Sequence, residues 1–221
     1  MSYFKEVEML LHEERQKIIE YGRRLLSANL TTAFGGNLSI FNRAEQLVAI
    51  KPSGVDYNKM RPRDVVITSP GGEVVDGKLK PSSELRFHLA LYQVRQDINA
   101  VVHTHQVHAT TVACLQRELP PMHYLIAFSG DKVPLAPYAT FGTQQLSDNI
   151  IHAIGQYNAC LMANHGLVTV GSSIDQAFTV AEMIELVAQV YIQASSIGQP
   201  ALLSSGQVHE TVEKFRTYGQ H

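Results

Sequence analysis

The chain has 221 residues, of which 45% are apolar and 17% charged, and its formal net charge is −2. A chain of this length can bury a large core without disulfides, and a charge so close to neutral gives no reason to expect nucleic acid or an anionic membrane as a partner. The first residues are too charged for a secretory signal, no apolar stretch approaches membrane-spanning length, and the two cysteines form no C-x-x-C pair. We therefore expect a protein of the cytoplasm.

In the first half of the chain, one helical pattern is followed by short strands separated by turns. Residues 6–29 carry apolar side chains at helical spacing, with charged residues between them. Two glycines, at 35 and 36, then lead into a short strand. Further strand-like runs are QLVAIK at 46–51, DVVIT at 64–68 and EVVDG at 73–77, the last as a hairpin partner after the turn at 70–72.

In the second half, helices and strands alternate. Ser82 and Ser83 are good helix N-cap types and predict a helix that ends at about residue 96. We expect extended segments at 99–105, 132–135, 159–163 and 167–170, and helices at 109–115, 144–154, 173–197 and within 204–221. The pattern predicts a single α/β domain over residues 1–221, with a mostly antiparallel or mixed central sheet flanked by helices on both faces.

The most informative motif is Val101-Val102-His103-Thr104-His105, an apolar run that ends in two histidines. Alternate side chains of a β-strand share one face, so His103 and His105 would point the same way with their Cα atoms ~7 Å apart. Two imidazoles that converge from one strand end can hold a divalent metal ion. A pair of this kind is as often structural or incidental.

Two further residues could complete such a site, because catalytic zinc usually has three protein ligands and one open position. His165 lies in Asn164-His165-Gly166, where the glycine allows a turn between two expected strands. Glu84 lies near the start of a helix, where the helix dipole favours a carboxylate. Both have ordinary alternatives, as a loop histidine and a helix-terminal charge, and His88 shares the helical face of Glu84 and could simply pair with it.

Small residues in turns and at a helix start suggest an anion site beside these ligands. The segments are Gly35-Gly36-Asn37, Ser53-Gly54 and Ser82-Ser83. Their backbone N–H groups and hydroxyls can donate hydrogen bonds to a phosphate. Each segment taken alone is equally well explained as an ordinary turn.

Five motifs occur in an order that resembles the class II aldolase/adducin family. They are Gly-Gly-Asn-Leu-Ser at 35–39, Pro-Ser-Gly-Val-Asp-Tyr at 52–57, Pro-Ser-Ser-Glu at 81–84, His-Thr-His at 103–105 and Asn-His-Gly at 164–166. The similarity extends to APYATFGT at 136–143 and EKFRTYG at 213–219, segments that resemble the family members cleaving fuculose 1-phosphate.

The resemblance implies a zinc-dependent enzyme that cleaves a ketose 1-phosphate, similar to L-fuculose 1-phosphate, into dihydroxyacetone phosphate and an aldehyde. It also implies a homotetramer with active sites at subunit interfaces. The metal ligands that it implies are His103, His105, His165 and, as a displaceable fourth ligand, Glu84. The catalytic residues that it implies are Glu84 and, from a neighbouring subunit, Tyr124 and Tyr218. The phosphate pocket that it implies consists of Asn37, Ser53, Gly54, Ser82 and Ser83.

One residue departs from this pattern, and two alternatives stay open. Phe34 stands where the members cleaving fuculose 1-phosphate carry a threonine that helps to bind phosphate, so either the backbone alone serves the phosphate there or the substrate differs. One alternative is a related sugar-phosphate epimerase or dehydratase, although the epimerase-like relatives carry aspartate in place of Glu84. The other is a non-catalytic adducin-like scaffold, in which the ligand histidines should be missing.

Overall fold

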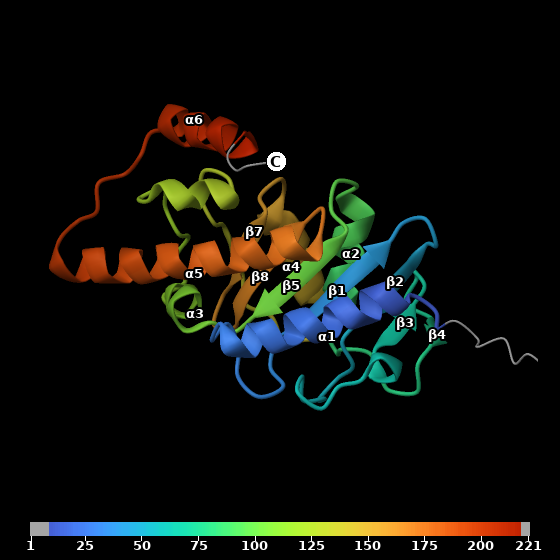
Figure 1. The fold of residues 1–221 in the computed structure, drawn as a ribbon. Helices are drawn as coiled ribbons and strands as arrows, with labels where there is room; N and C mark the ends of the chain where they lie inside the picture. The colour runs from blue at the N-terminus through green and yellow to red at the C-terminus, as the bar shows by residue number, and fades with distance from the viewer. Residues whose placement is uncertain (1–8, 218–221) are drawn as a thin grey trace, which may run out of the picture.

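An eight-stranded sheet forms the centre of the structure, a computed structural model that describes residues 9–217 (Figure 1). The strand order is β4-β3-β2-β1-β5-β8-β7-β6. Neighbouring strands run antiparallel except β6 and β7, which are parallel, so the sheet is mixed. The strands are β1 Asn37–Asn42, β2 Leu47–Ile50, β3 Val66–Thr68, β4 Val74–Asp76, β5 Ala100–Thr104, β6 Leu135–Ala136, β7 Ala159–Met162 and β8 Gly166–Gly171.

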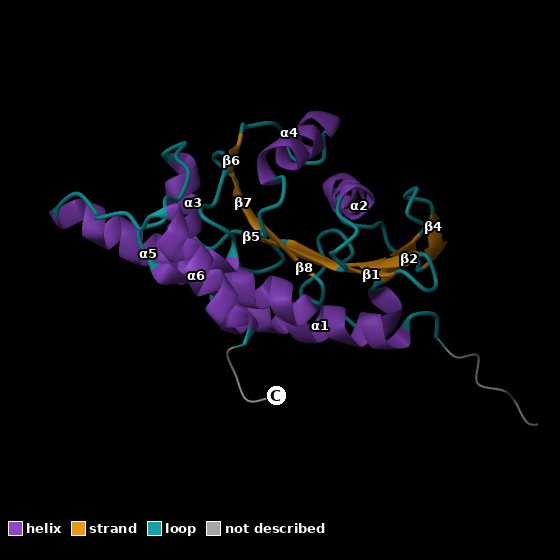
Figure 2. Ribbon diagram, turned by 90° about the horizontal axis from the view of Figure 1, so that it is seen from above, coloured by secondary structure: helices purple, strands orange, loops and turns teal. Residues whose placement is uncertain are grey.

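Helices cover both faces of this sheet (Figure 2). Helices α2 and α4 pack together on one face, and α1, α3 and α5 cover the other, with α6 lying over η2. The α-helices are α1 His12–Ser27, α2 Leu85–Val94, α3 Val107–Cys114, α4 Gln144–Ile154, α5 Ile174–Ile197 and α6 Ser205–Arg216. Two short 3₁₀ helices, η1 Pro62–Asp64 and η2 Tyr124–Phe128, complete the described elements. The predicted α/β class, with a mixed sheet between helices, is confirmed.

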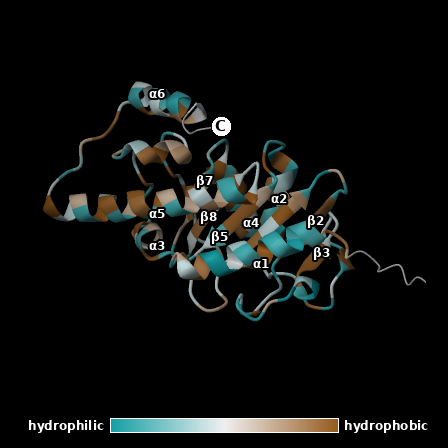
Figure 3. Cartoon of the chain, in the orientation of Figure 1, coloured by the Kyte–Doolittle hydropathy of each residue, from teal (hydrophilic) through white to brown (hydrophobic). Residues whose placement is uncertain are grey.

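The central strand β5 separates two apolar cores. Its residues are fully buried, with Val102 in the core under α1 and α5 and Val101 in the core under α2 and α4. Figure 3 colours the residues of this region by hydropathy, from teal for hydrophilic to brown for hydrophobic. Burial on both faces explains why the strand reads as an almost continuous apolar run rather than as an alternating one. No helix among residues 9–217 combines the length and the apolar character needed to cross a membrane.

The start of α2 differs from the prediction. Glu84 occupies the N-cap position and α2 begins at Leu85, so the prediction that Ser82 and Ser83 cap the helix was wrong. The segment before it is held in an extended form, because Pro81 forms a β-bridge with Pro52 and the Ser82 N–H donates to the Lys51 carbonyl. Tertiary pairing therefore delays the start of the helix by one or two residues and leaves Glu84 at its tip.

Candidate metal centre

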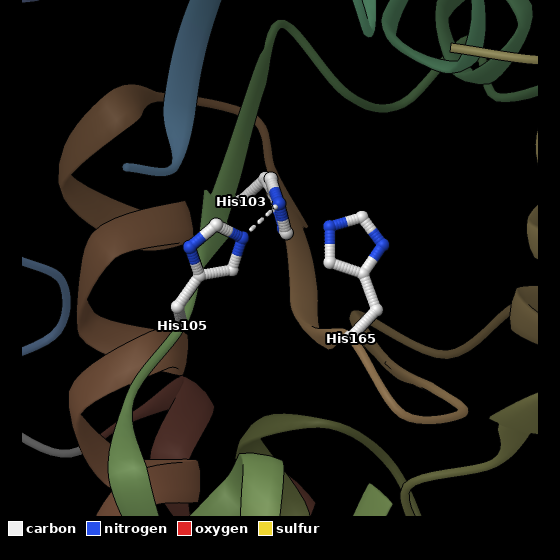
Figure 4. A group of neighbouring side chains, drawn as sticks. All are labelled: His103, His105 and His165. Atoms are coloured by element: carbon white, nitrogen blue, oxygen red, sulfur yellow. Dashed lines mark hydrogen bonds between the residues drawn. The ribbon is translucent and has the colours of Figure 1, made fainter. Parts of the chain in front are cut away.

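Three histidines converge where β5 ends and β8 begins (Figure 4). His103 lies within β5, His105 follows directly after its end, and His165 lies in the turn between β7 and β8. One ligand nitrogen from each ring lies within 4.8 Å of the others, and the Nε2 atoms of His103 and His105 are 3.0 Å apart. The antiparallel pairing of β5 with β8 brings the His165 turn beside the end of β5.

Two glycines of the sequence motifs permit this close approach. A Cβ atom on Gly166 would lie 2.3 Å from the Thr104 carbonyl oxygen. A Cβ atom on Gly36 would lie 2.5 Å from the His103 carbonyl oxygen, and Gly36 also has a φ of +64°. Both glycines are therefore required by packing around the cluster.

Burial favours the neutral form of all three imidazoles, most strongly for His103. It depresses the pKa of His103 well below its ordinary value, with further contributions from the neighbouring His105 and His165 rings. Burial lowers the pKa of His105. Burial and the neighbouring His105 ring lower the pKa of His165 to about 4. Nδ1 of His103 donates to the Leu167 carbonyl at 2.9 Å, so the Nε2 lone pair faces the cluster. Neutral imidazole with a free lone pair is the form that binds metal ions.

Glu84 brings a carboxylate to the same point. Its Oε2 atom lies 3.3 Å from Nε2 of His103, and its Oε1 atom lies 3.6 Å from Nε2 of His165. Burial raises the pKa of Glu84 to about 7, opposed by a hydrogen bond from Asn37. Oε1 is buried and has no hydrogen-bond partner among the described residues.

This donor set fits a divalent metal ion. The facing Nε2 atoms of His103 and His105 can share only one proton, and the buried Oε1 of Glu84 has unmatched lone pairs. A cation where these atoms converge would satisfy all of them. Three imidazoles and a carboxylate are ligand types found at catalytic zinc sites, and other first-row metals bind the same types.

Two of the turns expected to bind phosphate lie side by side and adjoin Glu84. The bridge between Pro52 and Pro81 aligns them, and the Ser53 N–H donates to the Lys80 carbonyl at 3.0 Å. The hydroxyl of Ser82 accepts a hydrogen bond from the Glu84 N–H at 3.2 Å. The expected anion pocket and the expected metal ligands are therefore contiguous in the structure.

The members of this expected pocket differ in exposure. Ser53, Gly54 and Ser83 are exposed, whereas Ser82 is buried. Gly54 has a φ of +67°, and a Cβ atom there would contact nothing within 4 Å, so its glycine serves the backbone conformation. Asn37 is also buried, and its side chain is engaged by Glu84 and His88. Asn37 therefore separates His88 from Glu84, which do not pair directly as the sequence allowed.

A buried lysine beside these turns was missed at the level of sequence. Lys51 donates to the Phe34 carbonyl at 3.0 Å, and its ammonium lies 4.8 Å from the centre of the Tyr57 ring. Burial lowers the pKa of Lys51 to about 8. The Phe34 side chain itself is exposed. The signal in the sequence was a single lysine directly before the Pro-Ser-Gly turn.

The two expected tyrosines do not join the cluster within the described residues. Tyr124 begins η2, is half exposed, and lies with its ring centre 4.9 Å from that of His123 and 6.1 Å from that of Phe215 in α6. Tyr218 lies outside the described residues.

Comparison with known proteins gives the family. The model of the class II aldolase and adducin N-terminal domain matches residues 16–192. A protein of Bacillus thuringiensis serovar kurstaki, named 5-deoxy-D-ribulose 1-phosphate aldolase, is 51% identical over 212 residues, which cover 96% of this chain and 100% of that protein. L-fuculose phosphate aldolase of Escherichia coli K12 is 39% identical over 206 residues, which cover 92% of this chain and 94% of that protein. A solved structure of L-fuculose 1-phosphate aldolase superposes with a TM-score of 0.91 at 41% identity, covering 92% of this chain and 96% of that one.

The chain therefore belongs to the class II aldolase and adducin family. The family resemblance expected from the five motifs is confirmed, and so is the enzyme class, because the relatives are named aldolases. The fold that the resemblance implied is confirmed by the superposition.

Proposed function

We propose that this chain cleaves a ketose 1-phosphate into dihydroxyacetone phosphate and an aldehyde, with a zinc ion held by His103, His105 and His165. The observation that carries this proposal is the convergence of three neutral imidazoles on a buried carboxylate oxygen that has no hydrogen-bond partner among residues 9–217. Buried oxygens of carboxylates are usually satisfied by a partner, so the position of this one beside three imidazoles supports a bound cation there. The adducin-like scaffold is disfavoured, because the ligand histidines are present and converge.

A retro-aldol cleavage needs charge stabilisation and proton transfer. The bond between C3 and C4 of the ketose breaks, the C4 hydroxyl loses its proton to become the aldehyde, and C3 gains a proton to give dihydroxyacetone phosphate. When bound, the zinc ion would supply Lewis acidity that offsets negative charge developing on the substrate oxygens.

The residues of the chain would provide the remaining functions. Glu84 is the proposed displaceable ligand and proton carrier, because its buried carboxylate lies beside His103 and His165 and can accept a proton once it leaves the metal. Ser53, Gly54, Ser82 and Ser83, with Asn37 beside Glu84, are the proposed phosphate-binding residues. Binding the phosphate there would orient the reacting carbons toward Glu84.

The substrate test uses a panel of ketose 1-phosphates. The named relatives make 5-deoxy-D-ribulose 1-phosphate (51% identity) and L-fuculose 1-phosphate (39% identity) the first compounds to assay. We expect the zinc-loaded protein to release dihydroxyacetone phosphate from at least one, measured by coupled NADH oxidation. Release from none would overturn the proposal, and an epimerised or dehydrated sugar phosphate without cleavage would support the alternative activities.

We further propose a homotetramer in which Tyr124, and Tyr218 beyond the described residues, serve the site of a neighbouring subunit. The exposure of Tyr124 and its contacts on η2 and α6 support this arrangement. Mixed oligomers of E84Q and Y124F should then regain activity that each variant alone lacks, because some sites combine intact residues. Mixtures no more active than the separate variants would place Tyr124 outside the shared site, and light scattering would give the number of subunits.

A further inference from the structure

A chain of buried polar side chains runs from Glu84 away from the histidine cluster. Nδ2 of Asn37 donates to Oε2 of Glu84 at 2.8 Å, and Oδ1 of Asn37 lies 2.5 Å from Nε2 of His88. Nδ1 of His88 lies 2.7 Å from the Ser39 hydroxyl, which lies 2.7 Å from the Tyr92 hydroxyl. None of the five residues exposes more than 6% of its surface. Bulk water therefore does not satisfy these groups.

This network of side chains forms where one stripe of α2, with helical periodicity, packs against one face of β1, with strand periodicity. Glu84, His88 and Tyr92 are spaced four residues apart and form one stripe along α2. Asn37 and Ser39 are spaced two residues apart and share one face of β1. The helix stripe and the strand face alternate their contacts, and the register places Asn37 opposite His103 on β5. The network thus connects the buried side chains between α2 and β1 to the histidine cluster.

When Glu84 is ionised, only one orientation of the Asn37 amide and one tautomer of neutral His88 satisfy this network. A carboxylate only accepts, so Asn37 must turn its NH₂ group toward Glu84 and its carbonyl oxygen toward His88. Neutral His88 must then carry its hydrogen on Nε2, which leaves Nδ1 to accept from Ser39. The Tyr92 hydroxyl donates to Ser39, whose hydroxyl and carbonyl oxygens it reaches at 2.7 and 3.0 Å. The donors of Ser39, His88 and Asn37 in this network therefore all point toward Glu84.

We propose that His88 is a positioning residue, whose Nε2–H fixes the Asn37 amide so that this amide holds the Glu84 carboxylate against His103 and His165. The opposite tautomer of His88 would present a lone pair to Asn37 and turn its amide over. The Asn37 carbonyl would then face the carboxylate and repel it. This inference rests on the proposed function of Glu84 in proton transfer, and it assigns His88 no contact with the substrate.

Two substitutions of His88 separate positioning from packing. In H88Q the side-chain amide reaches the place of Nε2 and can still donate to Asn37, whereas in H88N the amide reaches only the place of Nδ1. We expect H88N to lower kcat by ~10- to 100-fold with KM within ~3-fold, the range typical of lost support around a reacting group. H88Q should recover at least half of that loss on a logarithmic scale. Both remove the ring, so thermal denaturation should show similar losses of stability.

A rescue by H88Q would support the positioning role, since a purely structural role predicts that kcat follows stability in both variants. Equal kcat values in H88N and H88Q, at whatever stability, would overturn it. Y92F tests the end of the network farthest from Glu84. Loss of the Tyr92 hydroxyl should weaken the preference of the Ser39 hydroxyl for donating to His88, and it should lower kcat less than H88N does.

A measurement without substrate keeps this inference separate from the proposed function. Long-range ¹⁵N–¹H NMR of histidine-labelled, zinc-loaded protein without substrate, in which the cation keeps Glu84 ionised, should show His88 as the Nε2–H tautomer, identified by loss of its signals in H88Q. The Nδ1–H tautomer would overturn the proposal even in an active aldolase. If no ketose 1-phosphate is cleaved but the Nε2–H tautomer is observed, the proposed function fails while the orienting chain stands.

Discussion

The candidate site has two ends that are built in different ways. The metal end consists of His103, His105, His165 and Glu84, and it gathers neutral rings and a buried carboxylate at the end of a central strand. The turn end consists of Ser53, Gly54, Ser82 and Ser83, mostly exposed, on two turns joined by a single β-bridge.

The difference shows how burial divides the tasks of one site. At the metal end, His103 and Glu84 are fixed by packing and cannot change without leaving unsatisfied atoms in the interior. Side chains on the exposed turns can change at little cost to the fold, so the affinity for the phosphate that we propose they bind can vary there while the chemistry stays constant. The four predictions below test this division.

The largest effect is expected at the metal end. H105A should lose its bound zinc, from about one ion per chain, and lower kcat/KM for the cleaved ketose 1-phosphate by roughly a thousandfold. Metal analysis and the coupled assay measure both quantities. Because His105 is the most exposed of the three rings, the melting temperature of the metal-free protein should change little. The exposed His152 provides a matched control, and H152A should keep both zinc and activity; zinc and activity retained in H105A would refute the ligand assignment.

A smaller loss, confined to turnover, is expected for E84Q. The amide preserves the shape of the side chain but cannot carry a proton, so kcat should fall by ~10²- to 10⁴-fold. Zinc content at saturating metal should stay near one ion per chain, because three histidines remain. Near wild-type turnover in E84Q would show that Glu84 does not transfer the proton. The proposed division between chemistry at the metal end and binding at the turn end would then be wrong.

The convergence of side chains at the metal end could be predicted from the sequence, whereas their roles stay predictions. The strand period brought His103 and His105 together, and the five-motif order added His165 and Glu84. The fold class, β5 and the bounds of α4 followed from periodicity alone. Local patterns of this kind encode side-chain direction, which is why they succeeded.

The remaining features depend on pairing between distant segments. The bridge of Pro52 with Pro81 determines where α2 begins, and no local propensity reports it. The partner of His88 could not be chosen from helix spacing either, because Asn37 enters from β1, 51 residues away in the sequence. The buried state of Lys51 likewise follows from packing against Tyr57 and the Phe34 carbonyl.

At the turn end, S83A and S82A should differ. Ser83 is exposed and adjoins no proposed metal ligand except through the backbone, so S83A should raise KM by ~10-fold, as expected for one hydrogen bond to a charged group, with kcat little changed. Ser82 accepts from the Glu84 N–H, so S82A should lower kcat as well. Steady-state kinetics and competition by inorganic phosphate measure these effects. If S83A leaves both KM and phosphate inhibition unchanged, the exposed turn does not bind the phosphate.

The smallest effect concerns stability and the buried charge beside the turn end. The pKa of Lys51 is about 8 in the folded protein and about 10.5 in the unfolded chain, so the folded state binds this proton less tightly. Its contribution to the free energy of unfolding should therefore be least favourable below pH 8 and rise as the pH increases from 8 toward 10.5. K51M should remove that slope and stabilise the protein at pH 7 by ~1–2 kcal/mol, which is less than the full pKa shift implies because Lys51 also donates to the Phe34 carbonyl.

Urea denaturation of metal-free K51M between pH 7 and pH 9.5 measures this contribution, and K59M, at an exposed lysine of the same loop region, controls for the loss of a positive charge. A less stable K51M would mean that the contacts with Phe34 and Tyr57 outweigh the cost of burying the ammonium. The turn end would then also depend on a buried polar group for its structure, as the metal end does, and the two ends would differ only in exposure.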